Sequence, residues 1–530
     1  MRDLARVLAM TLAVAVGPGM PVGVTAGPVP PACPAADVDR LGRSSMELLD
    51  IAATTAASPD PGCRRLGRAV ADLVLARGEA AAGAWERLAA EAGEGPPALR
   101  AVAAALAFRA GHPREAHRLA AGVLRARPRS ALAWEVLGRV LAARFLEEAA
   151  REAFRRVLVI DPGDPGALRG LALLEDDREA KARLLERYLA VAGDRGEPWD
   201  RSRAAREHLA LLAALGDRPV FVLERADLPG TIPLRPVPGR PGFPRGFVLE
   251  AELGGRRPEP LLLDTGASGV HLAARAARRA GFQPLAAGTL VGGGGNARHR
   301  VRRGIVPVLG LGPVVYRDPL VAAAPGSLER RGAWRGILGA DVLGGLRLLF
   351  RPRRPAIDLL PADAAAGDDP LVVDPWDLPA GELPVLRVEG QLLVPLRYGV
   401  GRDRREGLFV LDTGASRTIL AAGAAEGLPG VRPGSGLRRI RAYGGTVAPV
   451  GRVPVLWIGA PDPGRPRALR AGVELRDLPV IDPGPRAWLS GTRVTGWLGL
   501  DVLARGPFEL DLARGTFRFP ARARCRRGRR

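Results

Sequence analysis

The sequence predicts a multidomain protein in which an all-α region of helical repeats is followed by an all-β region built as a double lobe. Two observations carry this prediction. From about 38 to 217 the chain is rich in alanine, leucine and arginine, with helical periodicity and no convincing strands. Further on, an apolar run followed by Asp-Thr-Gly-Ala-Ser occurs twice, at 261–268 and at 409–416. A chain of 530 residues has room for several such domains.

Shifts in composition set the predicted boundaries. Proline, glycine and arginine dominate after the helical region, and a short acidic and polar stretch separates the two copies of the repeated string. In order, the predicted segments are a signal peptide (1–26), a helical domain (36–217), a proline-rich linker (218–245), a first lobe (246–361), an inter-lobe linker (362–377), a second lobe (378–520) and a basic tail (521–530). The proline-rich linker is expected to be extended, with room for an edge strand at 220–223.

The amino terminus is typical of an export signal. Arginines precede an apolar stretch at 7–16, and Val24-Thr25-Ala26 satisfies the small-residue rule for cleavage after Ala26. We therefore expect an exported protein, periplasmic or secreted, with no membrane span after cleavage. An uncleaved signal anchor stays open as an alternative because Gly17-Pro18-Gly19 interrupts the region. A lipid anchor on Cys33 is disfavoured because the prolines before it fit a lipidation site badly.

Three cysteines suit an oxidising compartment. Cys33 and Cys63 flank a helical pattern, so a disulfide between them would staple that helix to its neighbour, leaving Cys525 over. The five histidines do not cluster with cysteines or carboxylates at the spacing of a zinc site. The sequence therefore predicts no metal and no cofactor.

The helical region contains one well-defined repeat. Residues 131–164 resemble the tetratricopeptide repeat, and the positions that carry this resemblance are Trp134, Leu137, Gly138, Leu141, Ala150, Phe154 and Pro162. Each helix pair of such a solenoid has an apolar face that only a neighbouring pair covers. Two interpretations stay open: a scaffold that recruits a protein partner, and a structural domain that packs on the β region.

The formal charge of +22 would favour nucleic acid as a partner. The basic residues are almost all arginines, however, and they are scattered through helices and loops with few aromatic residues among them. The charge therefore predicts no nucleic-acid binding, and the basic tail is interpreted as a solvated end.

The two lobes are copies of one unit. The aspartates of the repeated string are 148 residues apart, whereas the later motifs Gly336–Leu343 and Gly496–Leu503 are 160 apart. The larger offset predicts an insertion in the second copy, expected as a surface loop at about 460–471. In each copy the apolar run predicts a buried strand, and Asp-Thr-Gly predicts a tight turn that presents a carboxylate at its end.

At these residues the chain resembles the aspartic peptidases, and its short lobes with Asp-Thr-Gly-Ala-Ser resemble retropepsin-type domains more than pepsin, over about 245–520. The resemblance implies that Asp264 and Asp412 form a catalytic dyad. It further implies that the dyad is held by turn residues of both copies, Thr265, Gly266, Thr413 and Gly414. Flap positions are expected at Gly293, Gly294, Tyr443 and Gly444, although glycine runs of this kind also form plain loops.

Two carboxylates held close together cannot both ionise cheaply, so they share a proton and serve as acid and base. The sequence therefore predicts an endopeptidase that hydrolyses polypeptides. The alternative is a catalytically silent protein that binds peptides in the double lobe and recruits partners through its helices. Asp341 and Asp501, within the later motifs, are expected to cap the short helix that follows.

Overall fold

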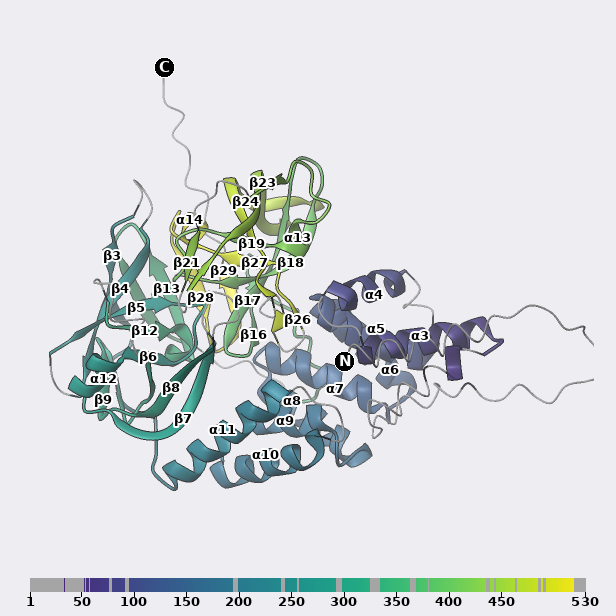
Figure 1. The fold of residues 1–530 in the computed structure, drawn as a ribbon, viewed down its shortest axis with the longest axis horizontal. Helices are drawn as coiled ribbons and strands as arrows, with labels where there is room; N and C mark the ends of the chain where they lie inside the picture. Colours follow the sequence, from purple (N-terminus) through teal and green to yellow (C-terminus); the bar gives the residue numbers. More distant parts are fainter. Residues whose placement is uncertain are drawn as a thin grey trace, which may run out of the picture.

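In the computed structural model, the described residues are 33, 52, 54–56, 58–75, 79–90, 95–193, 199–239, 244–254, 257–291, 298–324, 334–362, 368–379, 381–434, 439–442, 445–462, 465–484, 488–489 and 492–518. A helical region precedes a β-rich region, as the sequence predicts (Figure 1). The predicted signal peptide and basic tail lie outside the described residues. Within the described part of the chain, no helix has both the length and the apolar character needed to cross a membrane.

The helical region packs as consecutive antiparallel pairs, such as α5 with α6 and α7 with α8. The described helices are α3 (Pro61–Leu75), α4 (Glu79–Ala89), α5 (Pro97–Ala110), α6 (Pro113–Ala126), α7 (Ala131–Ala143), α8 (Glu147–Ile160), α9 (Pro165–Leu174), α10 (Arg178–Ala192) and α11 (Trp199–Leu215). Local sequence explains their starts. Ser130, Asp164 and Asp177 each accept a hydrogen bond from the backbone three residues on, and α5, α6 and α9 begin with proline.

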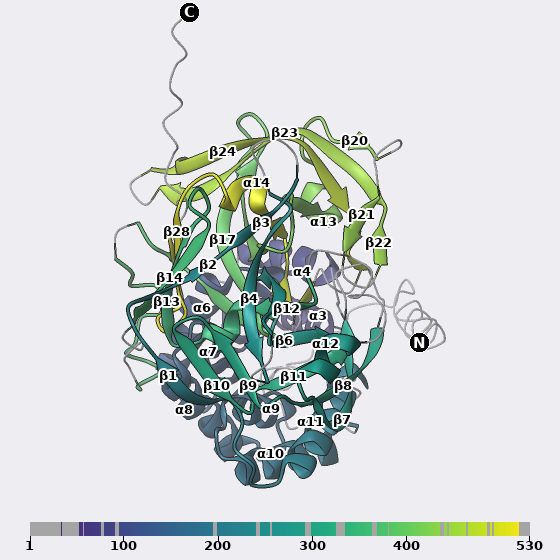
Figure 2. The ribbon, with the colours of Figure 1, turned by 90° about the vertical axis from the view of Figure 1, so that its left-hand side faces the viewer.

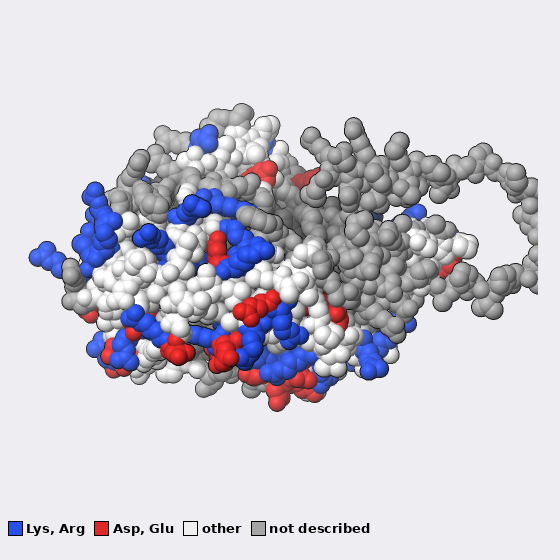
Figure 3. Space-filling model, turned by 60° about the horizontal axis from the view of Figure 1, so that its bottom comes forward, with Lys and Arg blue, Asp and Glu red and all other residues white. Residues whose placement is uncertain are grey.

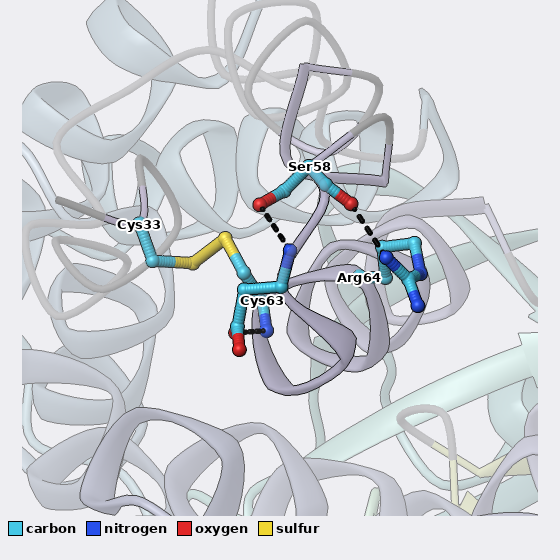
Figure 4. The surroundings of a disulfide bond; sticks show 5 residues. Cys33, Ser58, Cys63 and Arg64 are labelled. Atoms are coloured by element: carbon cyan, nitrogen blue, oxygen red, sulfur yellow. Dashed lines mark hydrogen bonds between the residues drawn. A yellow bond between two sulfur atoms is a disulfide. The ribbon is translucent and has the colours of Figure 1, made fainter. Parts of the chain in front are cut away.

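The predicted disulfide between Cys33 and Cys63 is confirmed (Figure 4). It joins two residues 30 positions apart in the chain and ends on the first turn of α3. That turn is capped by Asp60, which accepts a hydrogen bond from the Cys63 amide at 2.5 Å, while Arg64 donates to the Ser58 carbonyl at 2.9 Å. The bond therefore attaches the segment at Cys33 to a well-formed helix start.

The first lobe is a large mixed sheet followed by two strands that leave it. Its elements are β1 (Val222–Ala226), β2 (Gly230–Pro233), β3 (Arg235–Val237), β4 (Gly246–Leu253), β5 (Glu259–Asp264), β6 (Val270–Ala273), α12 (Ala274–Arg279), β7 (Gln283–Val291), β8 (Arg298–Ile305), β9 (Val308–Leu311), β10 (Val314–Arg317), β11 (Leu320–Ala324), β12 (Gly336–Gly339), the 3₁₀ helix η3 (Ala340–Leu343), β13 (Leu346–Arg351) and β14 (Ala356–Pro361). The described strands of the sheet run in the order β1-β10-β9-β4-β5-β12-β6-β11-β8-β7.

The second lobe repeats this plan. Its elements are β15 (Leu383–Pro384), β16 (Leu386–Val388), β17 (Gln391–Gly399), β18 (Arg405–Leu411), β19 (Ile419–Ala421), α13 (Ala422–Ala425), β20 (Arg432–Pro433), β21 (Ile440–Ala442), β22 (Gly445–Val447), β23 (Pro449–Asp462), β24 (Arg465–Ile481), β25 (Trp488–Leu489), β26 (Thr492–Arg493), β27 (Gly496–Leu498), α14 (Leu500–Leu503), β28 (Phe508–Asp511) and β29 (Thr516–Arg518). Its sheet runs in the order β16-β17-β18-β27-β19-β24-β23-β20.

The same three-strand arrangement lies at the centre of both sheets. In the first lobe β12 inserts between β5, to which it is parallel, and β6, to which it is antiparallel. In the second lobe β27 inserts in the same way between β18 and β19. Glycine starts both inserted strands because a Cβ there would lie 2.5 Å from the His271 carbonyl oxygen at Gly336, and 2.3 Å from that of Ile419 at Gly496. The recurring glycines of the later motifs are thus explained by close strand approach.

A third sheet joins the lobes, in the order β15-β29-β28-β13-β14-β2. At its centre β13 of the first lobe pairs antiparallel with β28 of the second, and the rings of Phe350 and Phe508 stack with centroids 4.4 Å apart. One continuous apolar core fills both lobes and this sheet. Figure 2 places β13, β14 and β28 on one side of the lobe pair, and β7–β8 with β21–β22 on the other.

Two sequence predictions need correction here. The stretch 218–245 is more than a linker with one edge strand. β1, at the edge of the first lobe's sheet, overlaps the edge strand expected at 220–223, whereas β2 and β3 were not predicted, and β2 is the edge strand of the joining sheet. Proline is tolerated in edge strands. The many prolines therefore indicate an extended chain, but they do not indicate that this chain is left without a strand partner. The insertion at about 460–471 is not a loop, because it forms the end of the long β23–β24 hairpin, with Ala460 opposite Ala471.

Acidic and basic side chains intermingle on the face shown in Figure 3. Several of the arginines on the helices pair with glutamates one turn away, as Arg156 does with Glu152 at 2.8 Å and Arg183 with Glu179 at 2.5 Å. Such exposed pairs contribute little to stability. They do divide the positive charge of this face into small patches.

Candidate active site

The two Asp-Thr-Gly turns meet where the lobes face each other. Asp264 is the last residue of β5, and Asp412 directly follows β18, so each carboxyl lies at the end of a buried strand of the central three-strand arrangement. In both turns the aspartate is half-buried, the threonine is buried and the serine is exposed. The duplicated sequence therefore produces a duplicated local structure.

The threonines lock the two turns together. The Thr265 amide donates to the Thr413 hydroxyl oxygen, and the Thr413 amide donates to the Thr265 hydroxyl oxygen, both at 3.0 Å. Each hydroxyl then donates across the interface to a strand carbonyl, from Thr265 to Leu411 at 2.7 Å and from Thr413 to Leu263 at 3.0 Å. Four hydrogen bonds between buried groups thus fix the position of one aspartate relative to the other.

Backbone amides of its own turn hold each carboxyl in place. The Gly266 amide donates to Asp264 Oδ1 at 2.9 Å, and the Ala415 amide donates to Asp412 Oδ1 at 2.8 Å. Each carboxyl also lies against the turn of the other lobe, because a Cβ on Gly266 would stand 3.0 Å from Cγ of Asp412 and a Cβ on Gly414 would stand 2.5 Å from Cγ of Asp264.

Both carboxyls are shifted toward the protonated form. Burial raises the pKa of Asp264, although the Gly266 amide opposes this shift. Burial also raises the pKa of Asp412 well above its usual range, and the negative charge of Asp264 raises it further. The pair therefore retains one proton at pH values where ordinary carboxyls have lost theirs, and that proton belongs to the pair as a unit.

The structure brings together six of the residues predicted for the site: Asp264, Asp412, Thr265, Gly266, Thr413 and Gly414. The four predicted flap positions, Gly293, Gly294, Tyr443 and Gly444, lie outside the described residues. The strands on either side of each are described, and they form the hairpins β7–β8 and β21–β22.

The predicted capping role of Asp341 and Asp501 is wrong. The cap position of the short helix is occupied by Gly339 in the first lobe and by Gly499 in the second, and neither helix has a side-chain cap bond. Asp341 instead accepts from the Gly269 amide at 2.8 Å, and Asp501 accepts from the amide and hydroxyl of Thr418 at 2.8 and 2.6 Å. Each aspartate therefore fixes the chain that leaves the Asp-Thr-Gly turn of its lobe. Both aspartates could be singled out because they recur at equivalent positions of the two lobes. Their closeness in sequence to the short helix suggested that helix as the partner, whereas the actual partners are Gly269 and Thr418.

Sequence reasoning also missed a contact between the lobes. The β16–β17 hairpin of the second lobe turns at Glu389 and Gly390, which both have positive φ. A Cβ on Gly390 would lie 2.8 Å from Cβ of Ser268, which follows the Asp-Thr-Gly turn of the first lobe. The pair Glu-Gly signals a tight hairpin turn, yet nothing in the sequence indicates what that turn touches.

No group of three or more histidine, cysteine, aspartate and glutamate side chains within the described part of the chain is arranged to hold a metal ion.

Comparison with known proteins agrees with this geometry. Residues 249–342, which include Asp264 and the motif around β12, match the aspartyl protease family model. No curated protein matches the chain. The β-rich region has an aspartic-protease-like fold.

Solved structures similar to this chain share little sequence with it. They include an aspartic proteinase from Irpex lacteus, at 13% identity and a TM-score of 0.33 over 56% of this chain and 97% of that one. Basic 7S globulin from soybean is 14% identical, with a TM-score of 0.32 over 57% and 95%. A protein described as edgp is 12% identical, with a TM-score of 0.33 over 57% and 96%.

Proposed function

We propose that this chain is an aspartic-type endopeptidase that hydrolyses polypeptides with the Asp264/Asp412 dyad. The observation that carries the proposal is the pair of carboxyls held in matching turns, which reciprocal threonine hydrogen bonds join across the lobes. The raised pKa of Asp412 adds support because it keeps one acid and one base in the site at the same pH.

The chemistry follows from the proton that the dyad shares. The ionised carboxyl, assigned to Asp264, accepts a proton from a water that attacks the peptide carbonyl carbon. The protonated carboxyl, assigned to Asp412, donates to the developing oxyanion. As the tetrahedral intermediate collapses, a proton passes to the leaving nitrogen and the C–N bond breaks. The proton on the nitrogen comes from Asp264, and a hydroxyl of the intermediate returns its proton to Asp412, so the dyad again holds a single proton and no covalent intermediate forms.

We propose that a single chain contains the complete site. Both Asp-Thr-Gly turns belong to one polypeptide, and the threonines that join them are 148 residues apart within it. The resemblance to retropepsin-type domains concerns the shortness of each lobe. Because both lobes belong to one polypeptide, two chains do not need to pair to complete the site.

The helical region and the amino terminus extend the proposal. The tetratricopeptide interpretation is supported by Gly138 on α7, where a Cβ would lie 2.8 Å from the Phe154 ring on α8, so that only a small residue fits. Through these helices the protein would recruit a protein partner. Export to the periplasm or the medium is supported by the signal-like amino terminus and by the Cys33–Cys63 disulfide. Detection of the processed, disulfide-bonded chain in the exported fraction would test that part.

The function is tested by incubating the purified protein with a mixed peptide library, with and without a statine-type inhibitor. We expect cleavage that the inhibitor stops and that Asp264→Asn and Asp412→Asn each abolish. The control is Asp227→Asn, an exposed aspartate of the first lobe, which should keep full activity. Peptides bound by the wild type but never cleaved would favour the silent binding protein instead.

Mixing the two inactive variants tests the single-chain site. If each site is complete within one chain, the mixture stays inactive. Recovered activity would mean that lobes of different chains pair, and would overturn the single-chain model.

A further inference from the structure

One edge of the first lobe's sheet is covered by the last helix of the helical region. Among the described strands, the order of that sheet ends at β7, which pairs with β8 on one side. An edge strand presents backbone amides that need other partners. Figure 1 shows α11 lying beside β7 and β8 at the bottom of the first lobe.

Glu207 of α11 binds this edge through both carboxylate oxygens. Oε2 accepts from the Thr289 amide at 2.9 Å, and Oε1 accepts from the Thr289 hydroxyl at 2.7 Å. Arg203, one turn earlier on α11, donates to the same Oε1 at 3.0 Å and so orients the carboxylate. All three side chains are only partly exposed, which makes these charge-assisted bonds stronger than surface pairs.

Apolar and polar contacts continue along the hairpin. Leu211 and Leu215 of α11 form a buried cluster with Ile305 at the end of β8. Just after the helix, Arg218 donates to Gln283 and to Asp318, both at 2.9 Å. The helix end is therefore attached to the base of the β7–β8 hairpin, and Glu207 is attached farther along it.

This hairpin also packs near the catalytic turn. Val301 of β8 is buried in an apolar cluster with Trp334 and Ile337, against which both Leu290 and Ala267 pack. Leu290 directly follows the residue that Glu207 holds, and Ala267 directly follows the Asp264 turn. A displacement of β7 would thus move the apolar cluster against which Ala267, next to the Asp264 turn, packs.

The middle of the helical region, at the α7–α8 turn, is anchored on the second lobe. Arg144, buried at the α7–α8 turn, donates to the backbone carbonyls of Pro375 at 3.0 Å and Gly515 at 2.6 Å. Glu147 of α8 pairs with Arg387 of β16 at 2.5 Å. The helices therefore connect the second lobe to the first lobe's hairpin.

We propose that α11 positions the β7–β8 hairpin over the substrate-binding side of the first lobe, and that Glu207 is the positioning residue. The inference rests on the proposed peptidase function. It assigns the helical region a part in substrate affinity: when Glu207 is absent the hairpin loses its attachment at Thr289, and polypeptide binds less tightly while the dyad is unchanged.

The test compares three variants in the full chain. Glu207→Ala should raise KM about fivefold to tenfold with kcat nearly unchanged, because losing one charge-assisted contact is worth up to a factor of about ten. Glu207→Gln, which can still bond both Thr289 groups, should stay near the wild type. Glu179→Ala is the matched control, since Glu179 also pairs with an arginine one turn away but touches no strand.

Hydrogen exchange provides a second readout that needs no catalysis. The Thr289 amide should exchange faster in Glu207→Ala than in the wild type or in the two other variants. An active wild type whose Glu207→Ala variant keeps both its KM and its Thr289 exchange rate would overturn the inference alone. A wild type without any turnover that depends on Asp264 would overturn the proposed function, and with it the role of α11 in substrate affinity.

Discussion

Gly414 lies directly against the carboxyl of Asp264: a Cβ added there would stand 2.5 Å from both Cγ and Oδ2. Real atoms do not approach so closely, so Gly414→Ala would push the carboxyl out of its hydrogen-bonded place. We expect this variant to lose at least 100-fold in kcat/KM, on the order of the cost of a misplaced catalytic group. Turnover of a fluorogenic peptide measures it.

Gly122→Ala on α6 is the matched control, because a Cβ there meets no atom within 4 Å. Alanine in a helix interior is favoured over glycine by about 1 kcal/mol, so this variant should be active and slightly more stable. Full activity of Gly414→Ala would contradict the described approach of the two turns.

Thr413 holds the turns together, and its removal should cost stability. Thr413→Val keeps the shape but leaves the Thr265 amide without its acceptor and the Leu263 carbonyl without its donor. An unsatisfied buried group costs about 1 to 3 kcal/mol, so we expect a loss of roughly 2 to 5 kcal/mol in the free energy of unfolding, measured in urea. Thr413→Ser retains the hydroxyl and should lose much less. Equal losses in both variants would assign the effect to the methyl group.

The pair of aspartates could be predicted because the Asp-Thr-Gly motif occurs twice in the sequence. One Asp-Thr-Gly is an ordinary turn, but two copies with matching later motifs predict two carboxyls in equivalent places. Nothing local predicts that Asp341 reaches Gly269, 72 residues away, or that Glu207 reaches Thr289, 82 residues away. Such partners depend on how strands are ordered and domains docked, and no short-range pattern encodes them.

The same limit explains the error at 218–245. Proline density identified an extended chain correctly, since Pro233 ends an edge strand. Whether an extended chain pairs with a sheet depends on a free edge elsewhere, here that of β14. Sequence alone does not reveal that edge.

Arg144 should be essential for docking the helices. Its guanidinium donates to the carbonyls of Pro375, Val385 and Gly515, and burial lowers its pKa to about 10. Arg144→Met removes this donor from three buried carbonyls. That of Gly515 still accepts from the Val385 amide, so two carbonyls lose a partner, and at about 1 to 3 kcal/mol each we expect a loss of about 2 to 6 kcal/mol in unfolding free energy. Lysine supplies fewer donors than arginine, so the unfolding free energy of Arg144→Lys should lie between those of the wild type and Arg144→Met.

Arg183→Met controls for the loss of an arginine as such, because Arg183 is exposed and pairs only one turn away, with Glu179. It should change stability by less than about 0.5 kcal/mol. If Arg144→Met changed stability no more than Arg183→Met does, the buried contacts would not be what docks the helices.

The raised pKa of Asp412 predicts an unusual dependence of stability on pH. Between its unfolded pKa and its higher folded pKa, the native state binds more protons than the unfolded state. Stability therefore falls as pH rises through this window, and every unit of upward shift corresponds to about 1.4 kcal/mol lost above it. Asp412→Asn removes this penalty. The inactive variant should be more stable than the wild type at neutral pH, and the difference should vanish below about pH 3.5, where the carboxyl is protonated in both states.

The same shift sets the pH range of activity. Raised pKa values for both carboxyls should give a bell-shaped profile of kcat/KM with a mildly acidic to near-neutral optimum, whose limbs belong to the pair. Ala267 and Ala415 follow the two Asp-Thr-Gly turns, and serine at these positions would add hydroxyl donors that favour the charged carboxyls. The double variant should therefore work best at lower pH. Peptide hydrolysis measured from pH 2 to pH 9 decides this, and an unshifted optimum would show that burial and the repulsion between Asp264 and Asp412 alone set the working pH.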